Sequence, residues 1–464
     1  MPGRYVHPNW TPSVMPVAAG PLAIAIAYGI SILAYPPATS LARKQTMVYL
    51  FVPVFFAFRY CEYISPNSDH VDTLARACII WFAHMSYEVC ILEFKPNVRP
   101  GPGETKERIR QAYKVFFDRS HVQVVEQQQK QLYEQQEYNS STRAVYNINT
   151  EQKQEQDHAA TYKKTDEPIN VSEQKSQHIP QARYKHGFSR WQFVFYHFFK
   201  ALRLYAQQYA WEYYEYHVSP FRRDPDAYAT ADHISFFRRL PSSLHYREIY
   251  WRTEEAFNWN VPTKWLYESY HSIFAVLHVA LGIDGPEEWG LGLFGNLSAA
   301  WSVRRYWRHY WHNYIYHSFN GHVKCVTRGW LGMSRNTFTR LFENMLVFFL
   351  SGLMHTAVRW QVSPWGDIWA ITFMYTSQVI PLAIEGGVVY CWRKARKSLG
   401  YGTDAKWVDR FEYAIGYFWA FAWQFYSIST YWLVRDKWTE EKMAKNYQKE
   451  MESWGFNETD SESD

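Results

Sequence analysis

The stretch VAAGPLAIAIAYGISILAY (residues 17–35) decides the fold class, because its 19 residues include no charged side chain. A helix of about 20 apolar residues is long enough to cross the ~30 Å hydrocarbon core of a bilayer. Further apolar runs of similar length lie near residues 46–64, 72–94, 264–283, 341–362, 367–391 and 411–434. These runs predict an all-α protein, a polytopic membrane helix bundle of about seven to nine spans.

Several runs contain polar side chains, among them Arg76 and His84 in the third run and Asn344 and His355 in the fifth. An ionisable group inside a bilayer costs ~3 kcal/mol or more on insertion scales, so such groups face a protein interior and are candidates for function. We therefore predict that the helices enclose an internal tunnel.

Lysine and arginine residues follow the first and third runs, which under the positive-inside rule puts the N-terminus in the lumen and residue 95 in the cytosol. The segment after residue 95 is polar and Gln-rich, so it cannot bury enough apolar surface to fold alone. The predicted organisation is N-terminal transmembrane helices in 1–94, a largely disordered cytosolic insertion in 95–190, short interfacial aromatic and basic helices in 191–262, a transmembrane core in 263–434 and a charged, frayed tail in 435–464.

The net charge of +5 is spread along the chain and does not call for a nucleic-acid partner. The stretch GLGLFG (290–295) has the spacing of a dinucleotide-binding loop, but it lies between aromatic, membrane-like segments instead of a strand and a helix. We interpret it as a turn whose glycines let two backbones approach closely. The P-loop, H-E-x-x-H and G-x-S-x-G motifs are absent, which removes several classes of soluble enzyme.

The densest cluster of candidate functional residues is SVRRYWRHYWHN (302–313). If this stretch is α-helical, residues four apart share a face and form a cationic stripe beside an aromatic one. The cationic stripe comprises Arg304, Arg308 and His312, with Arg305 next to it, and the aromatic stripe comprises Trp307 and Trp311. The arginines could hold phosphate groups at a bilayer surface. An interfacial helix with snorkelling arginines and a tryptophan belt explains the pattern equally well.

A second cluster lies within the apolar run NMLVFFLSGLMH (344–355). Asn344, Ser351 and His355 are separated by seven and four residues, so they line one helical face, and Gly352 permits a close neighbouring helix. Polar groups on one face of a membrane helix predict a cavity. For His355 alone, a hydrogen-bonded contact between helices is an equally good interpretation.

Together these clusters resemble the wax-synthase-like branch of the membrane-bound O-acyltransferases. WGLGLFG (289–295), WSVRRYW (301–307) and WHN (311–313) correspond to a family signature that reads roughly P-L-F-G…S-L-R-R-F-W-G-R-x-W-H-Q, and SGLMH (351–355) corresponds to S-G-x-x-H. Arg308 stands where the family has Gly, and Asn313 where it has Gln. The sequence is similar in kind to the membrane acetyltransferases of fungal secondary-metabolite pathways.

The resemblance implies an acyl-CoA-dependent O-acyltransferase of the endoplasmic reticulum membrane. It implies that His355 is the catalytic base and His312 its partner; an imidazole, with a reference pKa near ~6.5, suits proton exchange at neutral pH. His312 or Asn313 could donate to the oxyanion, and Asn344 or Ser351 could orient the base. The expected donor is acetyl-CoA and the expected acceptor is the hydroxyl of a lipophilic alcohol such as a terpenoid or polyketide.

Acyl-CoA is thus a co-substrate, membrane lipid is the other expected partner, and the resemblance implies no metal and no permanently bound cofactor. The phosphates of acyl-CoA would meet Arg304, Arg305 and Arg308, beside Trp307 and Trp311.

Three alternatives stay open at the level of sequence. The protein could be a wax-ester synthase acting on long-chain alcohols. A membrane di-iron oxygenase would use a histidine cluster, here His309, His312, His317 and His322. A non-enzymatic transporter would also carry polar residues within its spans.

Overall fold

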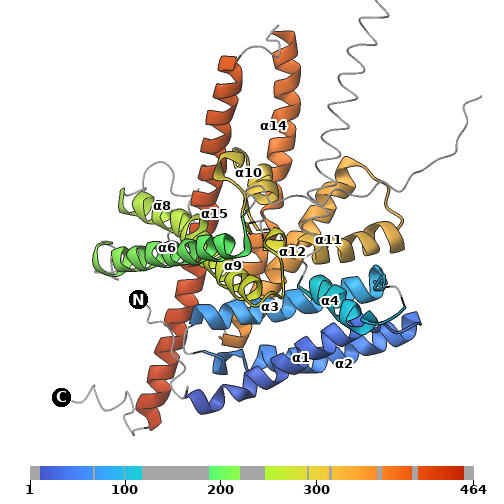
Figure 1. Ribbon diagram of the computed structural model, residues 1–464. Helices are drawn as coiled ribbons and strands as arrows, with labels where there is room; N and C mark the ends of the chain where they lie inside the picture. The colour runs from blue at the N-terminus through green and yellow to red at the C-terminus, as the bar shows by residue number, and fades with distance from the viewer. Residues whose placement is uncertain are drawn as a thin grey trace, which may run out of the picture.

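The computed structural model describes residues 11–65, 68–98, 100–117, 188–219, 246–289, 292–312, 316–362, 368–399 and 406–453. All regular structure in these residues is helical, as predicted (Figure 1). The helices are α1 (Pro16–Ala34), α2 (Ser40–Arg59), α3 (Ser68–Ser86), α4 (Glu104–Phe116), α6 (Arg190–His217), α8 (Tyr246–Asn260), α9 (Pro262–Ala280), α10 (Val303–Arg305), α11 (Tyr316–Lys324), α12 (Thr337–Val362), α13 (Ile368–Thr376), α14 (Val379–Ser398) and α15 (Lys406–Ser453). Three π-helical turns extend or follow them: η3 (Tyr87–Ile91), η9 (Tyr306–Tyr310) and η10 (Cys325–Trp330).

Three helical stretches in the described residues are long and apolar enough to cross a membrane, namely Pro12–Ala34, His70–Ile91 and Thr337–Gln361. They coincide with the first, third and fifth apolar runs of the sequence. The expected count of about seven to nine spans is not confirmed, and the internal tunnel stays a prediction. The run at 367–391 is not one helix, because α13 ends before α14 begins and Pro381, in the first turn of α14, has no N–H to continue a preceding helix.

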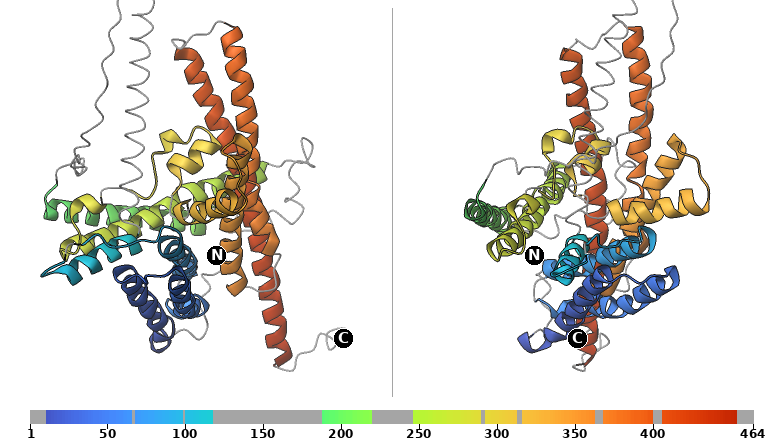
Figure 2. Two further views of the ribbon diagram at one scale, coloured as in Figure 1. Left: turned by 90° about the vertical axis from the view of Figure 1, so that its right-hand side faces the viewer. Right: turned by 45° about the vertical axis from the view of Figure 1, so that its right-hand side comes forward.

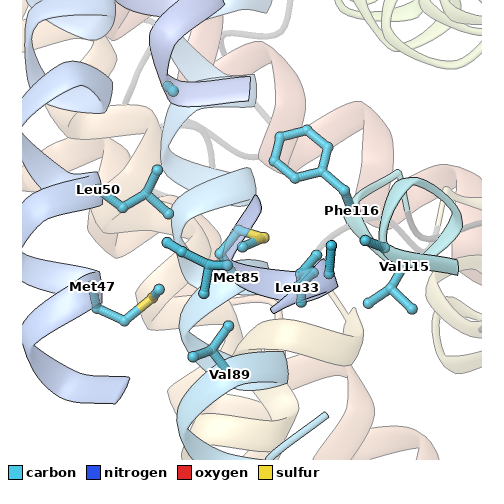
Figure 3. Close-up of a cluster of buried hydrophobic side chains, with 11 residues drawn as sticks. Leu33, Met47, Leu50, Met85, Val89, Val115 and Phe116 are labelled. Atoms are coloured by element: carbon cyan, nitrogen blue, oxygen red, sulfur yellow. The ribbon is translucent and has the colours of Figure 1, made fainter. Parts of the chain in front are cut away.

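Helices α1, α2, α3 and α4 pack around one apolar cluster (Figure 3). Leu33, Leu50, Met85 and Phe116 contribute to it from one helix each. Gly29 of α1 makes the contact with α4 possible, because a Cβ atom there would lie 2.5 Å from the Phe116 ring. Helix α4 falls within the segment predicted as a largely disordered insertion, so ordered structure continues through the start of that segment. Residues 118–187, the rest of it, lie outside the described residues.

Helix α6 is a single helix of 28 residues, not several short interfacial helices. Its start is fixed by a capping box, in which Ser189 and Gln192 each bond the other's backbone N–H. No glycine or proline interrupts it. It lies along α9, and Figures 1 and 2 show the two helices side by side.

The interface between α6 and α9 buries His197, whose ring lies 4.2 Å from that of Phe193. Burial, and then the charge of Lys200, lower the pKa of His197 to about 4. The unfolded chain binds a proton near pH ~6.5, so the unfolded state holds more protons between pH 6.5 and 4 and stability falls as pH falls through this window.

We therefore expect His197→Leu to flatten the pH dependence of stability between pH 6.5 and 4. At ~1.36 kcal/mol per pKa unit the histidine accounts for at most about 3 kcal/mol. Thermal unfolding midpoints of the solubilised protein at a series of pH values measure this. His217→Leu, at the exposed end of the same helix, serves as the control. An unchanged pH dependence in His197→Leu would contradict the prediction.

Helix α14 and the first part of α15 lie next to each other and project from the rest of the molecule (Figure 1). Arg396 of α14 bonds Asp409 and Glu412 of α15, and Trp392 donates to the same Glu412 carboxylate. Helix α15 then continues to Ser453, into the segment predicted as a charged, frayed tail. Good helix formers such as Glu, Lys, Met and Ala fill residues 440–451, without glycine or proline.

Candidate functional site

His355 lies in α12, and its ring stacks on Tyr375 of α13. The ring centroids are 4.3 Å apart and the planes differ by 8°. The two helices approach because of Gly352, where a Cβ atom would lie 2.8 Å from the Cα atom of Thr372. The predicted close helix contact at Gly352 is thus confirmed. Stacking fixes the plane of the imidazole and leaves its two nitrogens at the edge of the stack, where they can exchange a proton.

The segment before His312 is not one α-helix, so the predicted stripe of Arg304, Arg308 and His312 on a single face is wrong. The three-residue helix α10, capped by Ser302, passes directly into the π-helical turn η9. The Trp311 N–H donates to the carbonyl of Tyr306 at 2.8 Å, five residues back, and Trp311 itself is extended. Because a π turn is wider than an α turn and Trp311 then leaves the helix, His312 points in a direction that the four-residue spacing does not give.

Aromatic rings from two other parts of the chain pack around His312. The ring of Tyr267 in α9 lies 5.6 Å from the imidazole, and the ring of Phe294 lies 5.5 Å away in an edge-to-face arrangement. These contacts fix His312 although it lies outside a helix.

A row of stacked and tilted rings connects the two histidine segments. Trp311 stacks on Trp259 of α8, with centroids 5.3 Å apart and planes within 4°. Trp259 in turn lies 6.5 Å from Tyr375, the ring that stacks on His355. Trp307 contacts this row at Trp311, with ring centroids 6.0 Å apart, and also packs against Phe348 of α12 at 5.3 Å.

The end of the glycine-rich stretch, at Gly295, packs against the η9 turn. The Gly295 N–H donates to the carbonyl of Tyr310 at 2.9 Å. A Cβ atom on Gly295 would lie 1.7 Å from the His309 carbonyl oxygen, so the predicted close backbone approach is confirmed. From α9, Lys264 donates to the Gly295 carbonyl and Glu268 accepts from the Phe294 N–H. No strand lies among the described residues, and a dinucleotide-binding loop therefore does not fit here.

Arg76 is the charged neighbour that the two histidines have in common. Its positive charge is the largest electrostatic influence on both His312 and His355, and His312 also acts on His355. Arg76 Nη1 donates to the Tyr267 hydroxyl at 3.1 Å, and its Nε donates to the Asp72 carbonyl at 3.0 Å. The structure thus brings His312 and His355 into one charged and aromatic environment built from α3, α9, α12 and α13.

The protonation state of His312 follows from this environment. Burial, and then the positive charge of Arg76, lower the pKa of His312 to about 4. The imidazole is neutral at pH 7 and has one nitrogen that can accept a hydrogen bond or a proton.

The three arginines of the motif lie apart from this environment. Arg304 donates to the Leu382 carbonyl of α14 at 3.3 Å, and the Arg305 guanidinium lies 4.8 Å from the Trp301 ring centroid. Arg308 is exposed. None of the three is among the charged groups that act on His312 or His355.

The remaining predicted site residues are placed as follows. Ser351 is buried one turn before His355. Asn344 is exposed and lies three turns away, about 16 Å along the axis, so it is too far to touch the His355 ring. Asn313 lies outside the described residues.

The histidines considered as iron ligands have different surroundings. His322 Nε2 lies 2.8 Å from the Ser86 hydroxyl of α3, whereas His312 contacts Tyr267 and Phe294. Within the described ranges no three His, Cys, Asp or Glu side chains are grouped so as to hold a metal ion.

Arg76 and Tyr267 are not among the site residues predicted from the sequence. Arg76 carries a recognisable signal, because it is a charged residue inside a span-length apolar run. Tyr267 is one of many tyrosines in the sequence, and its role depends on a contact between α3 and α9 that no local pattern reveals.

The region that contains both histidines matches a known family. Residues 291–376 match the pattern of the membrane bound O-acyl transferase family. The resemblance found in the motifs is thereby confirmed over this region.

Several fungal acetyltransferases are similar to the chain at modest identity. Acetyltransferase nanB of Aspergillus nanangensis is 29% identical over 196 residues, which is 42% of this chain and 45% of nanB. Acetyltransferase ple2 of Rhodocybe pseudopiperita is 26% identical over 206 residues, covering 43% and 52% of the two chains, and acetyltransferase ataH of Aspergillus terreus is 27% identical over 165 residues, covering 35% and 52%. The chain therefore spans about half the length of these relatives. No solved structure matches it.

Proposed function

We propose that the protein is a membrane-bound O-acyltransferase of the endoplasmic reticulum that transfers an acetyl group from acetyl-CoA to a hydroxyl of a lipophilic small molecule, such as a terpenoid or polyketide. One observation carries the proposal: His312 and His355, from separate parts of the family-matched region, share Arg76 as a charged neighbour, and His312 also acts on His355. The names of the fungal relatives support acetyl as the transferred group.

In this proposal His355 is the general base. As the acceptor oxygen attacks the thioester carbonyl, His355 takes the hydroxyl proton, and a new C–O bond forms. The tetrahedral intermediate then collapses with cleavage of the C–S bond, and the departing CoA thiolate takes the proton from the imidazole. The products are an ester and free CoA, and His355 returns to its starting state.

General-base assistance is typically worth about 10²- to 10⁴-fold. Positioning of the two substrates and stabilisation of the oxyanion must supply the rest of the acceleration. We assign the oxyanion contact to the neighbourhood of His312 and Asn313, and an orienting role to Ser351. Helix α3 contributes Arg76, so the proposed site draws on the N-terminal helices as well as on the core at 263–434.

The test is label transfer in membranes that do or do not contain this chain. Radiolabelled acetyl-CoA and palmitoyl-CoA are supplied separately with an extract of hydroxylated terpenoids and polyketides or with long-chain alcohols, and labelled esters are separated and counted. We expect label only from acetyl-CoA and only in the first acceptor class. Label from palmitoyl-CoA in long-chain alcohols would identify a wax-ester synthase instead. No chain-dependent ester from any pair would refute acyl transfer, and uptake without ester formation would favour a transporter.

Arg308 is the motif arginine best placed to meet the phosphates of acyl-CoA, because its side chain is exposed, whereas the equally exposed Arg304 donates to the Leu382 carbonyl. We expect Arg308→Ala to raise the KM for acetyl-CoA about two- to fivefold, the size of an exposed ionic contact, and to leave the KM for the alcohol unchanged. Arg304→Ala and Arg305→Ala should also raise the KM for acetyl-CoA more than the KM for the alcohol, although each removes a contact within the protein. Arg335→Ala, also exposed, is the control. Equal increases for both substrates would mean that the arginines serve folding.

A further inference from the structure

Arg76 is a charged residue in a helical stretch that is long and apolar enough to cross a membrane. Placing a cation inside a membrane costs ~3 kcal/mol or more on insertion scales, so a charged residue in such a stretch is a candidate for a functional role. Its Nε donates to the carbonyl of Asp72 one turn earlier at 3.0 Å, and its Nη2 lies 3.8 Å from the Asp72 carboxylate. These contacts give the guanidinium a fixed orientation from within α3.

The other end of the guanidinium contacts the His312 environment. Nη1 donates to the Tyr267 hydroxyl at 3.1 Å, and the Tyr267 ring lies 5.6 Å from the His312 ring. The contact joins α3 to α9 across 191 positions of sequence. Because Tyr267 packs directly on the imidazole, the hydrogen bond from Arg76 restrains the surface against which His312 rests.

The same site also contains Arg359, one turn after His355 on α12. Its Nη2 lies 3.3 Å from the Asp72 carboxylate that Arg76 approaches. Asp72 therefore links α3 to the helix that carries His355. Arg76 bonds Tyr267 as well, and it acts on both imidazoles more strongly than any other charged group.

We propose that Arg76 is a positioning residue of the site: its hydrogen bond to Tyr267 fixes the ring that packs on His312, and its guanidinium supplies a fixed positive charge to the surroundings of that imidazole. This inference rests on the proposed acyl transfer for its effect on turnover. Its effect on His312 itself can be measured without any activity.

Three variants separate the contribution of the hydrogen bond from that of the charge. Tyr267→Phe removes the hydroxyl that receives the hydrogen bond but leaves the charge of Arg76 in place. Arg76→Met removes both the hydrogen bond to Tyr267 and the positive charge. Arg76→Lys keeps the charge but loses the planar guanidinium that makes the hydrogen bond. Arg59→Met, at the exposed end of α2, is the matched control for loss of an arginine.

The charge contribution predicts a shift in the titration of His312. Burial, the larger cause, remains in Arg76→Met, but the positive charge is lost, so the His312 pKa should rise from about 4. Other titratable or charged groups around the two imidazoles stay in place in this variant: Asp72 on α3, Tyr267 and Glu268 on α9, His355 and Arg359 on α12, and Tyr375 on α13.

The experiment follows the ring carbon resonances of isotope-labelled histidine in the solubilised protein against pH, with the His312 signal assigned by its loss in His312→Asn. We expect the titration midpoint to rise in Arg76→Met and to stay near the wild-type value in Arg76→Lys, Tyr267→Phe and Arg59→Met. In parallel, the acidic limb of kcat/KM should move to higher pH in Arg76→Met only, while Tyr267→Phe lowers kcat about fivefold with an unchanged KM for acetyl-CoA.

The outcomes distinguish this inference from the proposed function. An unchanged His312 midpoint in Arg76→Met overturns the role of Arg76, whatever the activity. If Arg76→Met does not accumulate as folded protein, wild-type kcat in both Arg76→Lys and Tyr267→Phe overturns it instead. A raised midpoint in a protein that transfers no acyl group supports the electrostatic role of Arg76 and refutes the acyltransferase.

Discussion

Replacing His355 with alanine is expected to lower acyl transfer by about 10²- to 10⁴-fold, the usual contribution of a general base. The variant removes the imidazole that stacks on Tyr375, while Gly352 and the contact between α12 and α13 remain. We therefore expect expression and membrane insertion to be retained. The measurement is the initial rate of ester formation per unit of immunodetected protein in membranes.

The control for this variant is His278→Ala. His278 lies on α9, where its Nδ1 bonds the Phe274 carbonyl of the same helix at 2.7 Å, and it should transfer acyl groups at the wild-type rate. Undiminished turnover by His355→Ala would remove His355 from the mechanism. Equal losses in both variants would show that the assay reports general damage to the bundle.

The second large effect is expected for Gly295→Ala, which should both destabilise the protein and reduce transfer by tenfold or more, because forcing extra volume into a packed site costs about 1–3 kcal/mol or more. The added Cβ atom would lie 1.7 Å from the His309 carbonyl oxygen, and a backbone atom cannot turn aside as a side chain can. Separation of the two segments would break the bond from Gly295 to Tyr310 and move Phe294 away from His312. Thermal unfolding and the rate of ester formation measure the two effects.

Gly329→Ala provides the comparison. Gly329 lies in the π-helical turn η10, and nothing lies within 4 Å of a Cβ atom placed there. We expect this variant to be as stable and as active as the wild type. If Gly295→Ala behaved like Gly329→Ala, the close approach of the two backbone segments would not matter for the site.

The close backbone approaches that require a residue without a side chain were predictable from the sequence. Gly295 and Gly352 occur where small residues stand beside polar or aromatic clusters, and both allow the close approaches that this arrangement predicts. The helical character of the apolar runs was equally accessible, because hydrophobic run length indicates it directly.

Other features could not be read from local patterns. The stripe of Arg304, Arg308 and His312 assumed 3.6 residues per turn, and the sequence does not reveal that Trp311 bonds Tyr306 in a wider turn. The involvement of Tyr267 depends on the hydrogen bond from Arg76, which joins residues far apart in the chain.

The π-helical turn before His312 makes the number of residues in the motif as important as their identity. An α-helix rotates by about 100° per residue, so a chain lacking one residue between Tyr306 and Trp311 would close with ordinary four-residue steps and swing His312 through about that angle. Homologues that keep the other motif residues but differ in the number of residues between Tyr306 and Trp311 would present a different side chain to their substrates. In an alignment, a gap or its absence between Tyr306 and Trp311 then indicates better than residue identity which homologues could use the same imidazole.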